Sequence, residues 1–90
     1  MAYTTESLTR ALQFAGDAIV DYRNSTGANR YTVVTADFDN KYIQKKLAQR
    51  RRPFEDGGIV VFSWDMDKFR VIDPATVTNV TPLSSVLKNV

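Results

Sequence analysis

The stretch that decides the fold is Ile59-Val60-Val61-Phe62-Ser63-Trp64, followed by Asp65-Met66-Asp67-Lys68 and then by Phe69-Arg70-Val71-Ile72. The first run is almost continuously apolar and rich in β-branched and aromatic side chains, which is typical of a strand covered on both faces. The polar residues that follow favour a turn. The sequence therefore predicts a hairpin whose first strand lies at the core of a sheet.

Residues on both sides of this hairpin predict further strands. Upstream, residues 30–38 are rich in β-branched and aromatic side chains, which indicates a strand. Downstream, Asp73-Pro74 ends the hairpin because proline cannot donate to a strand ladder. Residues 75–77 then predict one helical turn, and residues 78–81 predict a short strand.

The N-terminal segment has the spacing of an amphipathic helix. Its apolar residues recur at steps of four, three, four and three: Leu8, Leu12, Ala15, Ile19 and Tyr22. This spacing lines one face of a helix with 3.6 residues per turn. We therefore expect a helix over 6–23, capped by Thr5.

A second, shorter helix is expected between the strand at 30–38 and the hairpin. Its N-cap is Asp39 or Asn40, and it runs through Arg51 because a proline follows two residues later. Ile43 and Leu47 give it only a narrow apolar line. The sequence therefore predicts a basic helix that is mostly exposed to water.

Together these elements predict an α+β fold class in a single domain, residues 1–90. We expect a small, mainly antiparallel sheet of about four strands, with the N-terminal helix packed on it and a short basic second helix. The hairpin, the proline-containing turn and the short strand after it also resemble, in layout alone, the second half of small SH3-like barrels. That resemblance implies an SH3-like barrel as the alternative architecture.

The composition excludes most catalytic constellations. The chain has no cysteine and no histidine, so thiolate nucleophiles, sulfur-bound zinc and the commonest general base are absent. Two aspartate pairs, Asp37-x-Asp39 and Asp65-x-Asp67, lack the glycine and distal glutamate of a calcium loop. We therefore expect no enzyme activity, no catalytic residues, no metal site and no cofactor.

Targeting signals are also missing from the sequence. The N-terminal residues have no basic region followed by an apolar run, and nothing approaches the length of a membrane span. The expected location is therefore cytoplasmic, with no membrane partner.

Positive charge is concentrated in one segment. Residues 41–55 contain six basic residues and one acidic residue, a net charge of +5, whereas the whole chain carries +2. The basic residues are Lys41, Lys45, Lys46, Arg50, Arg51 and Arg52. The rest of the chain is therefore slightly acidic, with a net charge of −3.

This basic segment is the candidate binding site. On a helix its cations would repel one another, and a counter-anion would relieve the repulsion. Tyr42 and Phe54 flank the cations and could stack on bases. We expect a non-catalytic interaction module that contacts nucleic acid or an acidic protein surface, as in a small viral or phage accessory or inhibitor protein. The alternative is a solvated helix end, where arginines 50–52 satisfy the last carbonyls.

A rival hypothesis is a structural or assembly subunit. Residues 83–87 predict a short last helix capped by Ser84 or Ser85. Uncovered strands at 30–38 or 78–81 could pair with another chain. The apolar C-terminal side chains could dock in the same way: Leu83, Val86, Leu87 and Val90. This hypothesis predicts a homo-oligomer or a place in a larger complex.

Overall fold

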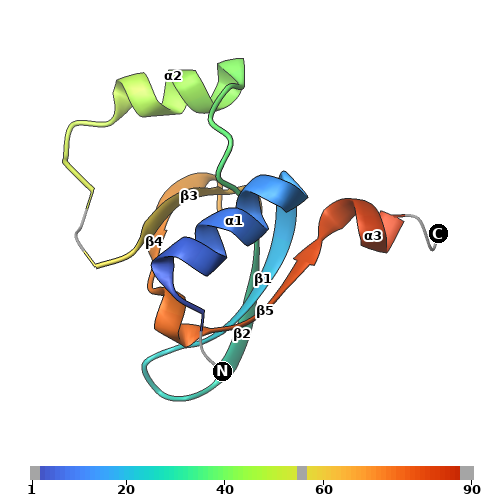
Figure 1. Ribbon diagram of the computed structural model, residues 1–90. Helices are drawn as coiled ribbons and strands as arrows, with labels where there is room; N and C mark the ends of the chain where they lie inside the picture. The colour runs from blue at the N-terminus through green and yellow to red at the C-terminus, as the bar shows by residue number, and fades with distance from the viewer. Residues whose placement is uncertain (1–2, 55–56, 88–90) are drawn as a thin grey trace.

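The fold is α+β, with an antiparallel sheet and helices on both of its faces (Figure 1). The computed structural model describes residues 3–54 and 57–87. Within these ranges the elements are α1 (Thr5–Ala15), β1 (Asp17–Arg23), β2 (Asn29–Thr35), α2 (Lys41–Gln49), β3 (Ile59–Ser63), β4 (Lys68–Ile72), η1 (Pro74–Thr76), β5 (Val77–Pro82) and α3 (Leu83–Leu87). The expected fold class, with an N-terminal helix on the sheet and a short basic second helix, is confirmed.

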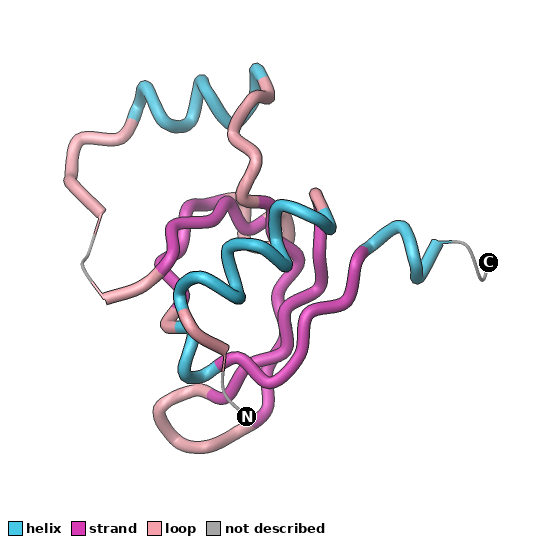
Figure 2. Tube along the Cα trace, viewed as in Figure 1, coloured by secondary structure: helices cyan, strands magenta, loops and turns pink. Residues whose placement is uncertain are grey.

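The sheet has five strands in the order β4-β3-β2-β1-β5, and every pair is antiparallel. The sheet curves strongly (Figure 2). As a result, Arg70 of β4 donates a hydrogen bond of 3.0 Å to the Tyr22 hydroxyl of β1, across two intervening strands. The sheet is nevertheless not closed, because β4 and β5 are its two ends. The sheet therefore does not close into the SH3-like barrel that was the alternative.

The fifth strand is β1, and it falls where the sequence analysis expected a helix. The prediction of one helix over 6–23 is wrong, because α1 ends at Ala15 and residues 17–23 form a strand. Gly16 causes this break: it adopts a φ of 73°, which L side chains rarely adopt, and its N–H bonds the Leu12 carbonyl at 3.0 Å. The N-cap is Thr4 rather than Thr5.

Ile19 and Tyr22 therefore do not lie on a helix face. Ile19 pairs with residues in both β2 and β5, so β1 is bonded on both of its edges. Ala18 and Val20 are fully buried on one side of β1, while Ile19 points to the other side. Ile19 and Tyr22 fit the helical spacing by coincidence. Hydrogen bonding along both edges of β1 decides that these residues form a strand instead.

The hairpin at the centre of the sequence analysis is confirmed as β3 and β4. Smaller shifts occur elsewhere: β2 ends at Thr35, the helical turn begins at Pro74, and β5 covers residues 77–82. Neither Ser84 nor Ser85 is an N-cap, because α3 begins at Leu83. Val90 lies outside the described residues.

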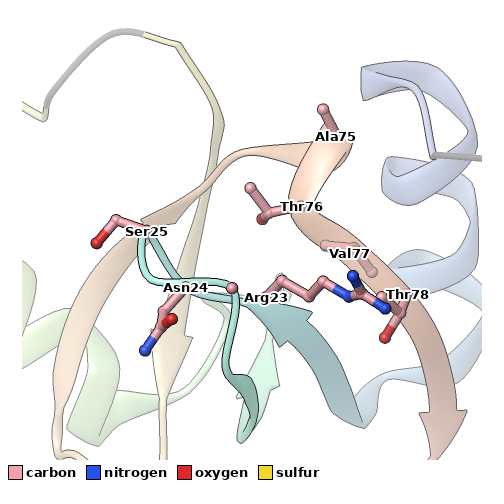
Figure 3. Close-up of a pocket in the computed structure, with 8 residues that line it drawn as sticks. Arg23, Asn24, Ser25, Ala75, Thr76, Val77 and Thr78 are labelled. Carbon is pink, nitrogen blue, oxygen red and sulfur yellow. The ribbon is translucent and has the colours of Figure 1, made fainter.

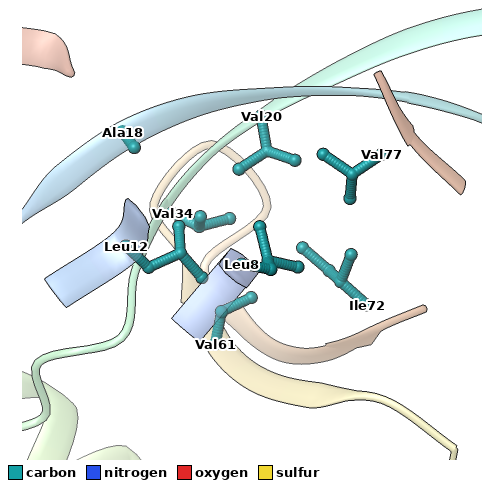
Figure 4. Close-up of a cluster of buried hydrophobic side chains, with 8 residues drawn as sticks. All are labelled: Leu8, Leu12, Ala18, Val20, Val34, Val61, Ile72 and Val77. Carbon is teal, nitrogen blue, oxygen red and sulfur yellow. The ribbon is translucent and has the colours of Figure 1, made fainter. Parts of the chain in front are cut away.

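The main core lies between α1 and the concave side of the sheet (Figure 4). Its buried members are Leu8, Leu12, Ala18, Val20, Val34, Val61, Ile72 and Val77. Leu8 and Leu12 are one turn apart on α1, so one apolar stripe of this helix covers the sheet. The stripe predicted from the helical spacing is thus correct as far as Ala15.

A second cluster, the aromatic cluster, lies on the opposite face of the hairpin. It consists of Phe38, Tyr42, Phe54, Phe62, Trp64 and Phe69. Phe62 is fully buried, and its ring centroid lies 5.1 Å from those of Trp64 and Phe69 and 6.2 Å from that of Tyr42. These edge-on contacts place α2 and the segment after it over this face of the sheet.

We expect the two faces of α1 to respond differently to truncation. Leu8 is fully buried, so Leu8→Ala should lower the free energy of unfolding by about 2–5 kcal/mol, from lost burial and the cavity left behind. Phe14 is 91% exposed, so Phe14→Ala should change it by less than about 0.5 kcal/mol. Urea denaturation followed by circular dichroism measures both values. Equal losses would contradict the packing of α1.

Candidate anion-binding segment 41–54

The position of α2 is set by its N-cap and by a narrow apolar contact. The Asn40 side chain accepts hydrogen bonds from the N–H groups of Tyr42 and Ile43, so Asn40 rather than Asp39 begins the helix. Ile43 is fully buried and Leu47 is half-buried. The narrow apolar line formed by Ile43 and Leu47 therefore faces the rest of the protein, as predicted. The helix ends at Gln49, two residues before the predicted end.

A carboxylate in the β3–β4 turn ties α2 to the sheet. Asp67 accepts a hydrogen bond of 2.5 Å from the Tyr42 hydroxyl and an ion-paired one of 3.1 Å from Lys46. Asp67 has a φ of 54°, a left-handed conformation that aspartate tolerates better than most residues. The turn therefore presents both oxygens of one side chain to one turn of α2.

The charges in this contact favour one another. The hydrogen bond from Tyr42, with that from Lys46, holds the pKa of Asp67 below its ordinary value. The same contact with Asp67 raises the pKa of both Tyr42 and Lys46. At neutral pH the carboxylate, the phenol and the ammonium group are therefore all in the states that form these hydrogen bonds.

The neighbouring aspartate of the turn faces β2 instead. Oδ1 of Asp65 accepts hydrogen bonds from the Thr32 and Ser63 hydroxyls and from the Val33 N–H, at 2.8, 2.7 and 3.1 Å. Partial burial alone would raise the pKa of Asp65, but these hydrogen bonds outweigh it and lower the pKa. Asp65 and Asp67 thus bind different elements and do not converge.

Arg50 and Phe54 form a structural pair in the loop after α2. The Arg50 guanidinium lies 4.0 Å from the centroid of the Phe54 ring and donates to the Pro53 carbonyl at 3.4 Å. The Phe54 ring also packs against Phe69 at 5.5 Å. Phe54 is therefore only partly open to a ligand, whereas Tyr42 keeps 47% of its surface exposed.

Most of the predicted cations have no acidic partner. In the described part of the chain the ion pairs are Arg10–Glu6 and Lys46–Asp67. Four of the remaining cations are also exposed and make no hydrogen bond there: Lys41, Lys45, Arg51 and Arg52. The structure therefore brings together Tyr42 and Lys46 at Asp67, and Arg50 with Phe54, and leaves these four cations in water.

Three further observations bear on function. Among residues 3–54 and 57–87, no three acidic, histidine or cysteine side chains gather where they could hold a metal ion. No helix in the same ranges is both long and apolar enough to span a membrane. Comparisons of the chain with protein family models, curated proteins and solved structures found no match.

Removing the charge of Asp67 should loosen α2. In Asp67→Asn the Lys46 ion pair is lost, so the pKa of Tyr42 should fall toward its ordinary value of about 10, and the amide hydrogens of α2 should exchange faster. NMR of the tyrosine ring carbons during a pH titration measures the first effect. Asp39→Asn is the matched control, since its carboxylate makes no hydrogen bond in the described part of the chain. An unchanged Tyr42 pKa and unchanged amide exchange of α2 in Asp67→Asn would contradict the contact of Asp67 with α2.

The two turn aspartates predict a loss of stability in acid. Their pKa values are lower in the folded chain than in the unfolded chain, so their contribution is present above the ordinary aspartate pKa of about 3.9 and disappears as pH falls through the folded values. Urea denaturation at a series of pH values should show this loss, and Asp65→Asn should show less of it. A pH dependence identical to that of wild type in Asp65→Asn would reject the role of this carboxylate.

Proposed function

We propose that this protein is a non-catalytic binding module that contacts nucleic acid through the segment 41–54. The observation that carries the proposal is the set of four exposed cations without an acidic partner in the described residues: Lys41, Lys45, Arg51 and Arg52. Ion pairing with phosphates releases condensed counterions, and this release is the main driving force for binding a polyanion.

The dimensions of the segment fit a strand of phosphates. A helix of nine residues, the length of α2, is about 13 Å long at 1.5 Å per residue. Phosphates of one duplex strand rise about 3.4 Å each along the duplex axis, so a helix that lies along this axis covers the rise of roughly four of them. Lys41 and Lys45 lie one turn apart on the helix, and Arg51 and Arg52 follow its end. The exposed ring of Tyr42 lies beside these cations and is available for stacking.

Two members of the basic segment have a different role in this proposal. Lys46 is held by Asp67, and Arg50 is held by Phe54 and the Pro53 carbonyl. These contacts fix the helix and its following loop against the aromatic cluster. Lys46 and Arg50 are therefore positioning residues, which keep the exposed cations in place before a ligand arrives.

The salt dependence of binding tests the proposal. For Arg51→Gln/Arg52→Gln we expect weaker binding to oligothymidylate, and a plot of log affinity against log salt whose slope is shallower by about 0.7 for each cation removed. Fluorescence anisotropy at several salt concentrations measures both. Both arginines are exposed, so the fold should not change.

The control removes the same charge elsewhere. Arg10→Gln/Arg30→Gln changes two exposed arginines on α1 and β2, and it should leave the slope unchanged. An equal loss of slope in this control would mean that net charge, rather than the segment 41–54, drives binding. Stronger binding to polyglutamate than to oligothymidylate would instead favour an acidic protein partner.

Assembly with other copies is the second candidate function. Two observations favour it: β4 and β5 are open edges, and α3 projects from the sheet with Val86 40% exposed (Figure 1). The strand at 30–38 is not such an edge, because β2 lies between β1 and β3. Analytical ultracentrifugation distinguishes the candidates. An oligomer that persists in high salt favours assembly, and a monomer rejects it.

A further inference from the structure

The exposed aromatic rings of the sheet have acidic neighbours. Trp64 is 37% exposed, and its indole N–H donates a hydrogen bond of 2.9 Å to the exposed carboxylate of Asp17. Tyr31 is 68% exposed, and its partner across the β1–β2 ladder is Asp21. Both carboxylates repel a chain of phosphates. These two rings are therefore unfavourable places for a base of a nucleic acid.

Tyr42 of α2 has cationic neighbours instead. It is 47% exposed, Lys41 precedes it, and Lys45 lies one turn further along the same side of α2. Neither lysine forms an ion pair within the described residues. The carboxylate that contacts Tyr42, on Asp67, is already paired with Lys46 at 3.1 Å. A base on the Tyr42 ring would therefore have its phosphates beside unpaired cations.

The Tyr42 ring is held in place by three contacts. Its hydroxyl donates to Asp67 in the β3–β4 turn. The ring lies at 83° to the buried ring of Phe62, with 6.2 Å between the two centroids, and the Lys46 ammonium group lies 5.7 Å from the Tyr42 centroid. These contacts still leave nearly half of Tyr42 exposed. An aromatic surface that is already fixed loses little conformational entropy when a base stacks on it.

Phe54, the other aromatic side chain of the segment 41–54, does not offer the same surface. The Arg50 guanidinium lies over its ring, 4.0 Å from the centroid, and the Phe69 ring packs against it at 5.5 Å. A base would have to displace one of these two groups. The segment therefore provides one stacking position, at Tyr42.

A cavity of about 620 Å³ between the β1–β2 hairpin loop and η1 provides no stacking position. None of the described residues that line it is aromatic. Figure 3 shows the Arg23 side chain extending toward Thr78, whereas the side chains of Asn24 and Ser25 point the other way. These polar groups do not converge on one ligand, so we assign none to this cavity.

We propose that the segment 41–54 binds single-stranded nucleic acid, with one base stacked on Tyr42 and the adjacent phosphates paired with Lys41 and Lys45. This inference rests on the proposed nucleic-acid contact and specifies the form of the nucleic acid. In a duplex the faces of the bases are stacked on one another, so the Tyr42 ring reaches none of them. In a single strand these faces are open, and every base has one, so the contact does not select a sequence.

The charges before α2 also favour one strand over two. Asp37 and Asp39 are exposed and lie just ahead of the helix. A duplex groove is bordered by the phosphates of both strands, which would bring phosphates close to these carboxylates as well as to the cations. A single strand can follow the cations alone.

Three ligands with the same number of phosphates test this proposal: oligothymidylate, an abasic oligomer with the same sugar-phosphate chain but no bases, and a DNA duplex. We expect wild type to bind the abasic oligomer about tenfold more weakly than oligothymidylate, the size expected for the loss of one stacked base. The duplex should also bind more weakly than oligothymidylate. Fluorescence anisotropy at one fixed salt concentration measures all three affinities.

Variants of Tyr42 separate stacking from a structural role of this residue. Tyr42→Leu keeps an apolar side chain against Phe62 but has no ring, so it should bind oligothymidylate and the abasic oligomer with equal affinity. Tyr42→Phe restores the ring without the hydroxyl, and it should recover most of the preference for oligothymidylate. Tyr31→Leu is the matched control, since it removes an exposed tyrosine from β2, outside the segment 41–54, and it should keep the wild-type preference.

The outcomes distinguish this inference from the function on which it rests. Equal affinity of wild type for oligothymidylate and the abasic oligomer would overturn the stacking contact while leaving the phosphate contact in place. A duplex that binds more tightly than oligothymidylate would overturn the preference for a single strand. A Tyr42→Leu variant that still prefers oligothymidylate would also overturn the role of Tyr42. No binding to any of the three ligands would reject the proposed function itself, and this inference with it.

Discussion

The structure depends on the burial of two consecutive residues, Val61 and Phe62, on opposite faces of β3. Both are fully buried, and successive side chains of a strand point to opposite sides, so this strand needs a cover on each face. Helix α1 supplies one cover. The other comes from the rest of the aromatic cluster, of which Tyr42 and Phe54 belong to the basic segment. Since the apolar side of that segment must face Phe62, its remaining cations are left in water.

The β3–β4 turn fixes the orientation of α2 on the sheet. Asp65 bonds Thr32 and Ser63 inside the sheet, whereas Asp67 bonds Tyr42 and Lys46 on α2. One short turn thus links the sheet to the helix through two carboxylates with different partners. The exposed ion pair of Asp67 contributes little stability by itself. Its effect is on direction: the two contacts of Asp67 restrict how α2 can rotate above the aromatic cluster.

The sequence predicted those elements that carry strong local signals, and it failed where distant pairing decides. The hairpin follows from its turn formers, the N-terminal stripe as far as Ala15 from its spacing, and a cap at Asp39 or Asn40 from a side-chain oxygen. Strand β1 was missed although it forms a hairpin with the neighbouring β2, because Ile19 and Tyr22 also fit a helical spacing; its second partner, β5, lies nearly sixty residues further along the chain. The cations of 41–52 were visible in the composition, but the contact of Lys46 with Asp67 joins residues separated by 21 positions.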